Sequence, residues 1–292
     1  MNIIATMLCI AAAGITTLTV CQAGESPVRP VDLANLGEGA RTDEWRGFQR
    51  HLFKVDGANC WVVEPKQPAP GNPWMWCMEF PDAFADRTGA LAVLGRGFYY
   101  VHIEVGNTFG CPKACVKFDG FYKFLSTHGF AKRGVLLGIS RGGLYAYNWA
   151  ATNTDKVAGI CGDAPVCDFK SWPGGKGRGK GSQPDWESLI RCYEFSNEAE
   201  ALKYAKNPVD NLAPLAKARI PLIHVVGDAD DVVPVDENTA LIESRYRALG
   251  GTITVHHKPG IGHHPHGLED PSPVADFAEA CVGLRPATAP RK

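Results

Sequence analysis

The sequence feature that most constrains the fold is a serine between two glycines, within residues 134–143 (GVLLGISRGG). Residues 135–137 are apolar and predict the end of a buried strand, and residues 144–152 have the pattern of a helix. A sharp turn between a strand and a helix, with glycines two positions before and after the serine, is the setting of a nucleophile elbow. We therefore expect Ser140 to project above the carboxyl edge of a parallel sheet.

Apolar runs alternate with helical patterns along the rest of the chain, which predicts a mainly parallel sheet with helices on both faces. Asp56 and Gly57 mark a hairpin turn, so one edge should be antiparallel. The expected strands are residues 48–55, 59–64, 74–78, 98–105, 135–137, 157–161, 220–226 and 252–257, and the expected helices are residues 83–94, 112–125, 144–152, 186–204, 237–249 and 274–282. These patterns predict one α/β domain over residues 24–292, with an eight-stranded sheet and a lid-like insertion at 166–207.

The first 23 residues differ from the rest in composition. Residues 3–20 carry no charge, and a polar run begins after Ala23, which predicts a signal peptide and a secreted or periplasmic protein. A membrane-spanning helix and a lipoprotein anchored at Cys21 are the alternatives, and we expect no stable membrane insertion. The formal net charge of the whole chain is −1, so nothing in its charge indicates a nucleic-acid partner.

The chain has ten cysteines, of which eight follow the signal peptide. An exported chain with an even number of cysteines permits disulfides, and Cys111 and Cys115 are close enough in sequence to pair. Metal binding is the competing hypothesis for these two. Buried free thiols are the alternative for Cys60, Cys77 and Cys281.

An acid that could orient a catalytic base follows the strand predicted at residues 220–226. Three aspartates compete there, and we assign the role to Asp230, which lies three residues after Gly227. Residues just past a parallel strand lie at the carboxyl edge of the sheet, where open sheets place their sites. Asp163, at the end of an earlier strand, is the alternative acid.

The base is expected from the loop at residues 258–267, which contains three histidines. We choose His263, directly after Gly262, because it completes the chain order serine, aspartate, histidine. His264 and His266 are then expected to support the base or to face the substrate. A histidine–aspartate metal site is the rival hypothesis, but these spacings do not define a tetrahedral set, so we predict neither metal nor cofactor.

The residue types define a mechanism. His263 would take the proton of Ser140 during nucleophilic attack, and Asp230 would orient the imidazole. The backbone N–H of Arg141, together with one from Glu79 or Phe80, would hold the tetrahedral oxyanion.

The sequence resembles the α/β-hydrolase superfamily over nearly all of residues 24–292. More narrowly, it is similar to bacterial carbohydrate esterases of the kind that includes gut-bacterial pectin methylesterases, in the segments at residues 138–144, 163–168, 170–175 and 263–266. The resemblance implies a triad of Ser140, Asp230 and His263. It also implies an arginine directly after the double-tryptophan strand, where this chain has Cys77.

Substrate contacts are predicted from a glycine-rich basic loop. Lys176 and Arg178 in that loop, with Arg141 beside the serine, would suit a uronate, and Trp172 could stack on a sugar ring. A mobile solvated loop is the alternative. We therefore predict an exported serine carboxylesterase that acts on methyl or acetyl esters of a polysaccharide or on a small ester. A serine peptidase of the prolyl-oligopeptidase type and a non-catalytic carbohydrate-binding protein are the rival hypotheses.

Overall fold

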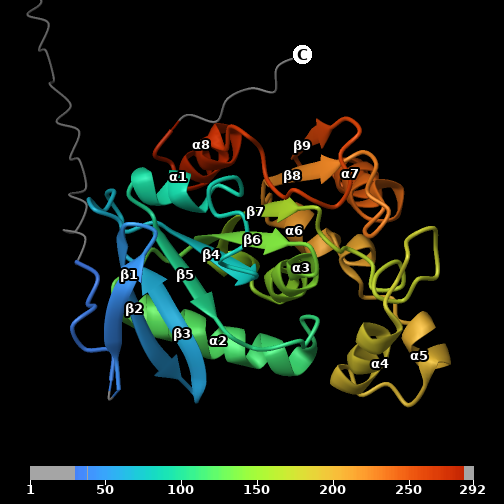
Figure 1. The fold of residues 1–292 in the computed structure, drawn as a ribbon, viewed down its shortest axis with the longest axis horizontal. Helices are drawn as coiled ribbons and strands as arrows, with labels where there is room; N and C mark the ends of the chain where they lie inside the picture. Colours follow the sequence, from blue (N-terminus) through green and yellow to red (C-terminus); the bar gives the residue numbers. More distant parts are fainter. Residues whose placement is uncertain (1–29, 38, 286–292) are drawn as a thin grey trace, which may run out of the picture.

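The computed structural model describes residues 30–37 and 39–285, so the predicted signal peptide lies outside the described residues. A nine-stranded sheet forms its centre, in the order β1-β2-β3-β5-β4-β6-β7-β8-β9 (Figure 1). β1, β2, β3 and β5 pair antiparallel, and every pairing from β5 to β9 is parallel. The strands are β1 (Arg41–Trp45), β2 (Phe48–Val55), β3 (Ala58–Val63), β4 (Trp74–Glu79), β5 (Tyr99–Ile103), β6 (Gly134–Ile139), β7 (Val157–Asp163), β8 (Leu222–Gly227) and β9 (Ile253–Lys258).

Helices cover both faces of the sheet, as Figure 1 shows. α1 and α8 pack together on one face, and α2 and α3 lie on the other. The helices are α1 (Ala90–Gly95), α2 (Pro112–Thr127), α3 (Gly142–Thr152), α4 (Gln183–Cys192), α5 (Glu198–Leu202), α6 (Ala213–Lys217), α7 (Thr239–Ala248) and α8 (Ser272–Cys281). None of the helices in the described part of the chain is both long and apolar enough to cross a bilayer.

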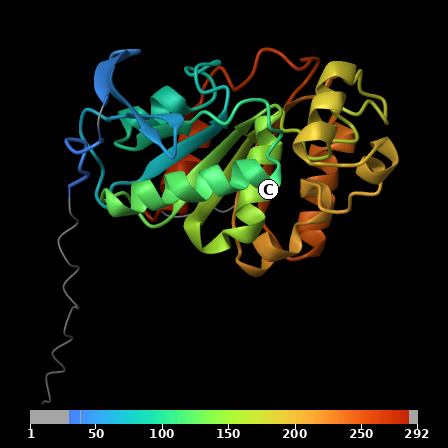
Figure 2. The ribbon, with the colours of Figure 1, turned by 90° about the horizontal axis from the view of Figure 1, so that it is seen from below.

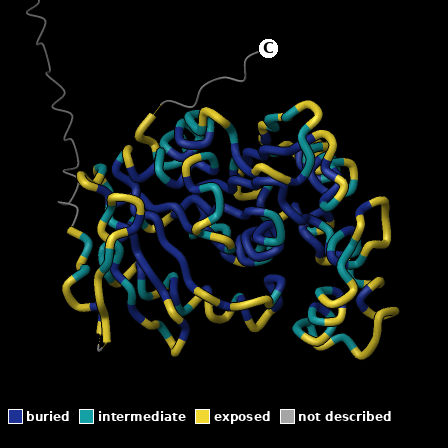
Figure 3. Tube along the Cα trace, in the orientation of Figure 1, coloured by how far each residue is buried: buried dark blue, intermediate teal, exposed yellow. Residues whose placement is uncertain are grey.

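Two apolar cores, one on each face, hold the layers together, and β4 shows why. Its side chains alternate, so that Trp74 and Trp76 enter the core beneath α2 and α3, while Met75 and Cys77 enter the core beneath α1 and α8. All four side chains are fully buried. A strand buried on both faces is apolar without interruption, as parallel strands are. Figure 3 shows the resulting buried centre and exposed rim.

The sequence-based expectations need two corrections in the first third of the chain. The sheet has nine strands rather than eight, because residues 41–45 form β1 and Trp45 packs against Tyr100 at 5.6 Å. The helix expected at residues 83–94 begins only at Ala90, after a series of turns. Asp82, just before this segment, accepts a hydrogen bond from Trp45 Nε1.

The insertion and the cysteines need corrections as well. The single helix expected at residues 186–204 is divided into α4 and α5, which form a lobe at the side of the sheet (Figure 2). The eight cysteines of the described residues are all free, so the predicted Cys111–Cys115 disulfide is wrong. Cys115 is the fourth residue of α2, where its thiol faces the carbonyl oxygen of Gly110. Cys60 and Cys77 are buried thiols, as the alternative held, and Cys281 is half-buried.

Candidate active site

Ser140 lies between the end of β6 and the start of α3, in a left-handed backbone conformation with φ of 51°. This conformation is uncommon for a residue other than glycine and is maintained by its neighbours. The amide of Ser140 donates to the carbonyl of Asp163 at 2.8 Å, and its carbonyl accepts from the amides of Gly143 and Val166. The end of β7, the segment after it and the first turn of α3 therefore hold the turn in the geometry of a nucleophile elbow.

The glycines around Ser140 are required by close packing. A Cβ atom on Gly138 would lie 2.8 Å from the carbonyl oxygen of Gly142, and one on Gly143 would lie 2.6 Å from that of Val166. Neither atom can move away, because both belong to the backbone. Glycine is therefore required at both positions, because any side chain there would keep β6, α3 and the segment after β7 from approaching one another at Ser140.

The three side chains predicted to cooperate meet at the carboxyl edge of the sheet. Ser140 Oγ lies 2.9 Å from His263 Nε2, and His263 Nδ1 lies 2.7 Å from Asp230 Oδ2. The other carboxylate oxygen of Asp230 accepts from the amides of Val232 and Val233. Only 1% of the Asp230 side chain and 8% of the His263 side chain are exposed. The carboxylate accepts a hydrogen bond from the Nδ1–H of His263, which leaves Nε2 unprotonated and able to accept a hydrogen bond from the serine hydroxyl.

Two backbone amides near Ser140 can hold an oxyanion. Among the hydrogen bonds of the described residues, none uses the N–H of Arg141 or of Phe80. Arg141 follows the nucleophile, and Phe80 follows β4, with φ of 57°. Glu79, the other predicted donor, is instead the last residue of β4 and pairs with Gly138. Of the two predicted second donors, Phe80 is the one that lies outside the sheet, and its role as an oxyanion donor stays a prediction.

A partly buried ion pair stands beside the nucleophile, and it was not predicted from the sequence. The guanidinium of Arg141 binds Glu79 Oε1 at 2.7 Å and Asn107 Oδ1 at 2.6 Å, and it lies 4.8 Å from the ring centre of Phe80. Burial raises the pKa of Glu79, and the positive charge of Arg141 opposes this effect. No local sequence pattern joins two residues that are 62 positions apart.

Asp163, the alternative acid, forms a second aspartate–histidine pair. Its Oδ1 lies 2.5 Å from His266 Nδ1, and its Oδ2 accepts from the amide of Gly267 at 2.7 Å. Both side chains of the pair are 4% exposed. The ring of His266 stands 4.9 Å from that of His263, in an edge-to-face arrangement. Asp163 therefore binds the histidine loop through His266 and Gly267, whereas His263 is bound by Asp230.

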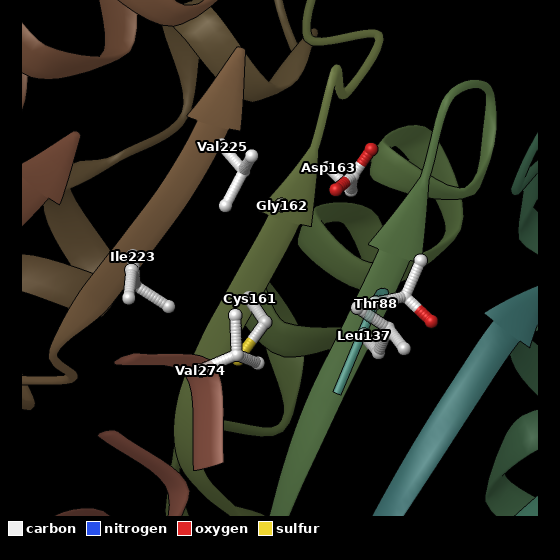
Figure 4. A pocket seen from close by; sticks show the side chains of 8 residues that line it. All are labelled: Thr88, Leu137, Cys161, Gly162, Asp163, Ile223, Val225 and Val274. Atoms are coloured by element: carbon white, nitrogen blue, oxygen red, sulfur yellow. The ribbon is translucent and has the colours of Figure 1, made fainter. Parts of the chain in front are cut away.

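A small cavity lies next to Asp163, between β6, β7, β8 and α8 (Figure 4). The cavity volume is about 10 Å³, close to the minimum that a single water molecule needs. Thr88 lines this cavity, and its buried hydroxyl has no partner among the described residues.

The remaining predicted side chains near the serine differ in exposure. His264 is exposed and stacks on Phe84 at 6.0 Å, and partial burial lowers its pKa. Trp172 is half-buried, 6.3 Å from Phe109. Cys77, where the resemblance implies an arginine, is fully buried, and burial raises the pKa of its thiol to about 12. It therefore replaces no exposed substrate contact.

The cations of the glycine-rich loop are all paired with acids of this chain. Lys176 binds Glu198 at 2.6 Å, Arg178 binds Asp236, and Lys180 binds Asp231 at 2.6 Å. The amide of Lys180 also donates to the carbonyl of Asp231, next to the catalytic acid candidate. The loop is therefore fastened to the segment after β8. A role of Lys176 and Arg178 in substrate binding stays a prediction.

Comparison with solved structures identifies the fold. The chain is similar to an S-formylglutathione hydrolase from Agrobacterium tumefaciens (14% identity, 84% of this chain and 96% of that one, TM-score 0.54) and to Est1E from Butyrivibrio proteoclasticus (16%, 84% and 99%, 0.54). It is also similar to a Mycobacterium tuberculosis puromycin-hydrolyzing peptidase (15% identity, TM-score 0.58), where 80% of this chain spans only 38% of that protein.

These likenesses show that the chain has the α/β-hydrolase fold, as its sequence predicts. No protein-family model matches the sequence, and none of the curated proteins compared with it does.

Proposed function

We propose that this protein is a serine hydrolase that cleaves carboxylic esters. The observation that carries the proposal is the continuous chain of hydrogen bonds from Ser140 through His263 to Asp230. Ser140 Oγ lies within hydrogen-bonding distance of His263 Nε2, and the buried carboxylate of Asp230 orients the imidazole. This is the geometry that activates a serine hydroxyl as a nucleophile.

The reaction would proceed through an acyl-enzyme. Ser140 Oγ attacks the ester carbonyl while His263 takes its proton, and the negative charge moves to the carbonyl oxygen, which the amides of Arg141 and Phe80 hold. The histidine then gives the proton to the departing alcohol. A water molecule, deprotonated by the same histidine, attacks the acyl group and releases the carboxylic acid. Loss of one oxyanion donor typically costs about 3 kcal/mol in such a barrier.

An ester-modified polysaccharide is the proposed substrate of an exported enzyme. The sequence segments that resemble carbohydrate esterases support it, as does the guanidinium of Arg141 directly after the nucleophile. Phe80 is 37% exposed beside that guanidinium and offers a flat apolar surface of the kind on which a sugar ring can rest. Lys176 and Arg178 are paired with acids of this chain and Arg141 is paired with Glu79, so a uronate would have to share or displace an internal partner at any of the three.

The test is a substrate screen with the wild type and Ser140→Ala. Methyl-esterified pectin, acetylated xylan and glucuronoyl esters are compared by release of methanol, acetate or alcohol. We expect the wild type to release product from at least one of them and from a short-chain aryl ester, and the variant to release none. Equal release by both proteins would exclude Ser140 as the nucleophile.

A serine peptidase is the second candidate, because peptidases are among the similar structures. This chain spans 35% of the Porphyromonas gingivalis dipeptidyl peptidase 4 that it resembles. Cleavage of aminoacyl amides, together with failure on all esters in the screen, would favour the peptidase. Tight glycan binding by a protein that does not react with serine-directed phosphonates would favour the non-catalytic alternative.

A further inference from the structure

Three histidines of the loop after β9 converge beside the nucleophile. One ring nitrogen each of His263, His264 and His266 lies within 4.8 Å of the other two. The ring centres are 4.8 to 5.0 Å apart, and the rings stand edge to face. Of these side chains, the mechanism uses only His263.

The polar partners of these rings distinguish the cluster from an accidental contact. His263 Nδ1 is bound to Asp230, and His266 Nδ1 is bound to Asp163, both within buried pairs. A carboxylate on Nδ1 fixes the ring orientation and makes the Nε2 atom a stronger ligand, and zinc-binding histidines commonly have such a partner. Among the hydrogen bonds of the described residues, none involves Nε2 of His266 or either ring nitrogen of His264.

We propose that His263, His264 and His266 form a binding site for a zinc-like divalent cation, and that the cation inhibits the hydrolase by occupying the nitrogen that must accept the proton of Ser140. His263 Nε2 cannot bind a metal and accept the serine hydroxyl at the same time. The binding step stands without the proposed function, whereas the inhibition rests on it.

The donor set selects the metal. Three neutral imidazoles suit Zn²⁺, Cu²⁺ and Ni²⁺, whereas Mg²⁺ and Ca²⁺ require oxygen ligands. Tetrahedral zinc with Zn–N bonds of about 2.0–2.1 Å places its ligand atoms about 3.4 Å apart. The rings must therefore close in from their present separation of up to 4.8 Å. His264 can provide most of this movement, because it is exposed and makes no hydrogen bond among the described residues.

The first test is calorimetric titration of the chelator-treated, desalted protein with ZnCl₂ alone. We expect one Zn²⁺ per chain for the wild type, and no heat with MgCl₂. His264→Ala and His266→Ala should each weaken binding by roughly tenfold or more. Asp163→Asn, which keeps all three ligands, should weaken it by about 10–100-fold. Unchanged affinity in both alanine variants would overturn the proposal.

His257→Gln is the matched control. His257 also pairs with an aspartate, with Nδ1 2.6 Å from Asp228, but it belongs to β9 and is outside the cluster. Its replacement should leave the zinc affinity unchanged. If His257→Gln lost as much zinc affinity as the cluster variants, the zinc site would not be the three-histidine cluster, and the proposal would be overturned. Circular dichroism of each variant separates a lost ligand from a lost fold.

The second test measures turnover of an aryl ester as Zn²⁺ is added, relative to the metal-free rate of the same variant. We expect complete inhibition of the wild type at saturation, recovery with EDTA, and inhibition in His264→Ala shifted to higher Zn²⁺. Zinc that binds without slowing turnover, or accelerates it, would overturn the inhibitory role. A metal-free protein inactive on all esters would instead count against the proposed function, and the calorimetric result would still decide the site.

Discussion

At the scale of single residues, the two aspartates beside the histidine loop have different tasks. Asp230 holds the histidine that contacts Ser140, whereas Asp163 holds His266 and the amide of Gly267. Both are buried and both lie at the carboxyl ends of parallel strands, so their sequence context does not separate them. Their hydrogen-bond partners distinguish the two aspartates, and we expect different effects when each is replaced.

Asp230→Asn should lower kcat by about 10³–10⁴-fold, because an amide at this position favours the wrong tautomer of His263. The loss of kcat in Asp163→Asn should be smaller by a factor of at least about ten, since His263 keeps its own carboxylate in that variant. The measurement is kcat for an aryl ester, with thermal melting as the control for folding. A larger loss in Asp163→Asn would assign the catalytic acid to Asp163 instead.

At the scale of elements, the approach of α3 to the segment after β7 depends on Gly143. In Gly143→Ala the new Cβ would lie 2.6 Å from Val166 O and 2.7 Å from Pro165 Cβ. We expect a loss of about 1–3 kcal/mol in the free energy of unfolding, and lower activity because α3 carries the turn of Ser140. Urea unfolding measures the first effect and ester turnover the second.

The matched control for this change is Gly95→Ala at the end of α1. Nothing lies within 4 Å of a Cβ at Gly95, and its backbone has no positive φ. Alanine there should stabilise the protein by about 0.4–1 kcal/mol and leave turnover unchanged. Equal destabilisation by both substitutions would show that close packing at Gly143 is not the cause.

The elements that could be predicted from the sequence are those whose pattern is local. The apolar runs of β6 and β8 are buried on both faces, and the glycines of the elbow mark a turn that few other residues allow. β1 (RTDEW) could not be predicted, because it is an edge strand whose polar side chains are largely exposed. The helix expected at residues 83–94 begins only at Ala90, and Phe84 in the segment before it has φ of 48°, which lies outside the right-handed helical region.

The candidate site was predictable in the same way. Ser140, Asp230 and His263 each follow a strand, and parallel strands end at the same edge. The pairing of Asp163 with His266, and of Glu79 with Arg141, depends on which loops meet in space, across 103 and 62 residues. A single sequence carries no signal for such pairs.

At the scale of the whole molecule, a buried histidine makes stability depend on pH. His224 in β8 is fully buried between Tyr147 Oη at 2.7 Å and Thr239 Oγ1 at 2.9 Å. Burial lowers its pKa from 6.5 to about 3. In the folded protein His224 therefore stays neutral down to about pH 3. In the unfolded chain the same side chain binds a proton as the pH falls through 6.5. Acidification below that pH therefore stabilises the unfolded chain relative to the folded protein.

The contribution of His224 to the free energy of unfolding should consequently fall by about 1.4 kcal/mol for each pH unit between pH 6.5 and pH 3. From pH 7 to pH 5 the loss is about 2 kcal/mol. Other groups titrate in this range, so the measurement is the difference between the wild type and His224→Gln in urea unfolding at both pH values. The variant should lose less stability on acidification. Equal losses in the two proteins would mean that His224 titrates alike in the folded and unfolded chain.

The burial of the cysteines decides how readily their thiols react. Burial raises the pKa of the Cys60, Cys77 and Cys115 thiols to about 12, so at neutral pH almost none of them is a thiolate, the form that reacts with oxidants and alkylating agents. A reagent reaches such a thiol only when the surrounding core opens, so the labelling rate of these three cysteines would report local unfolding.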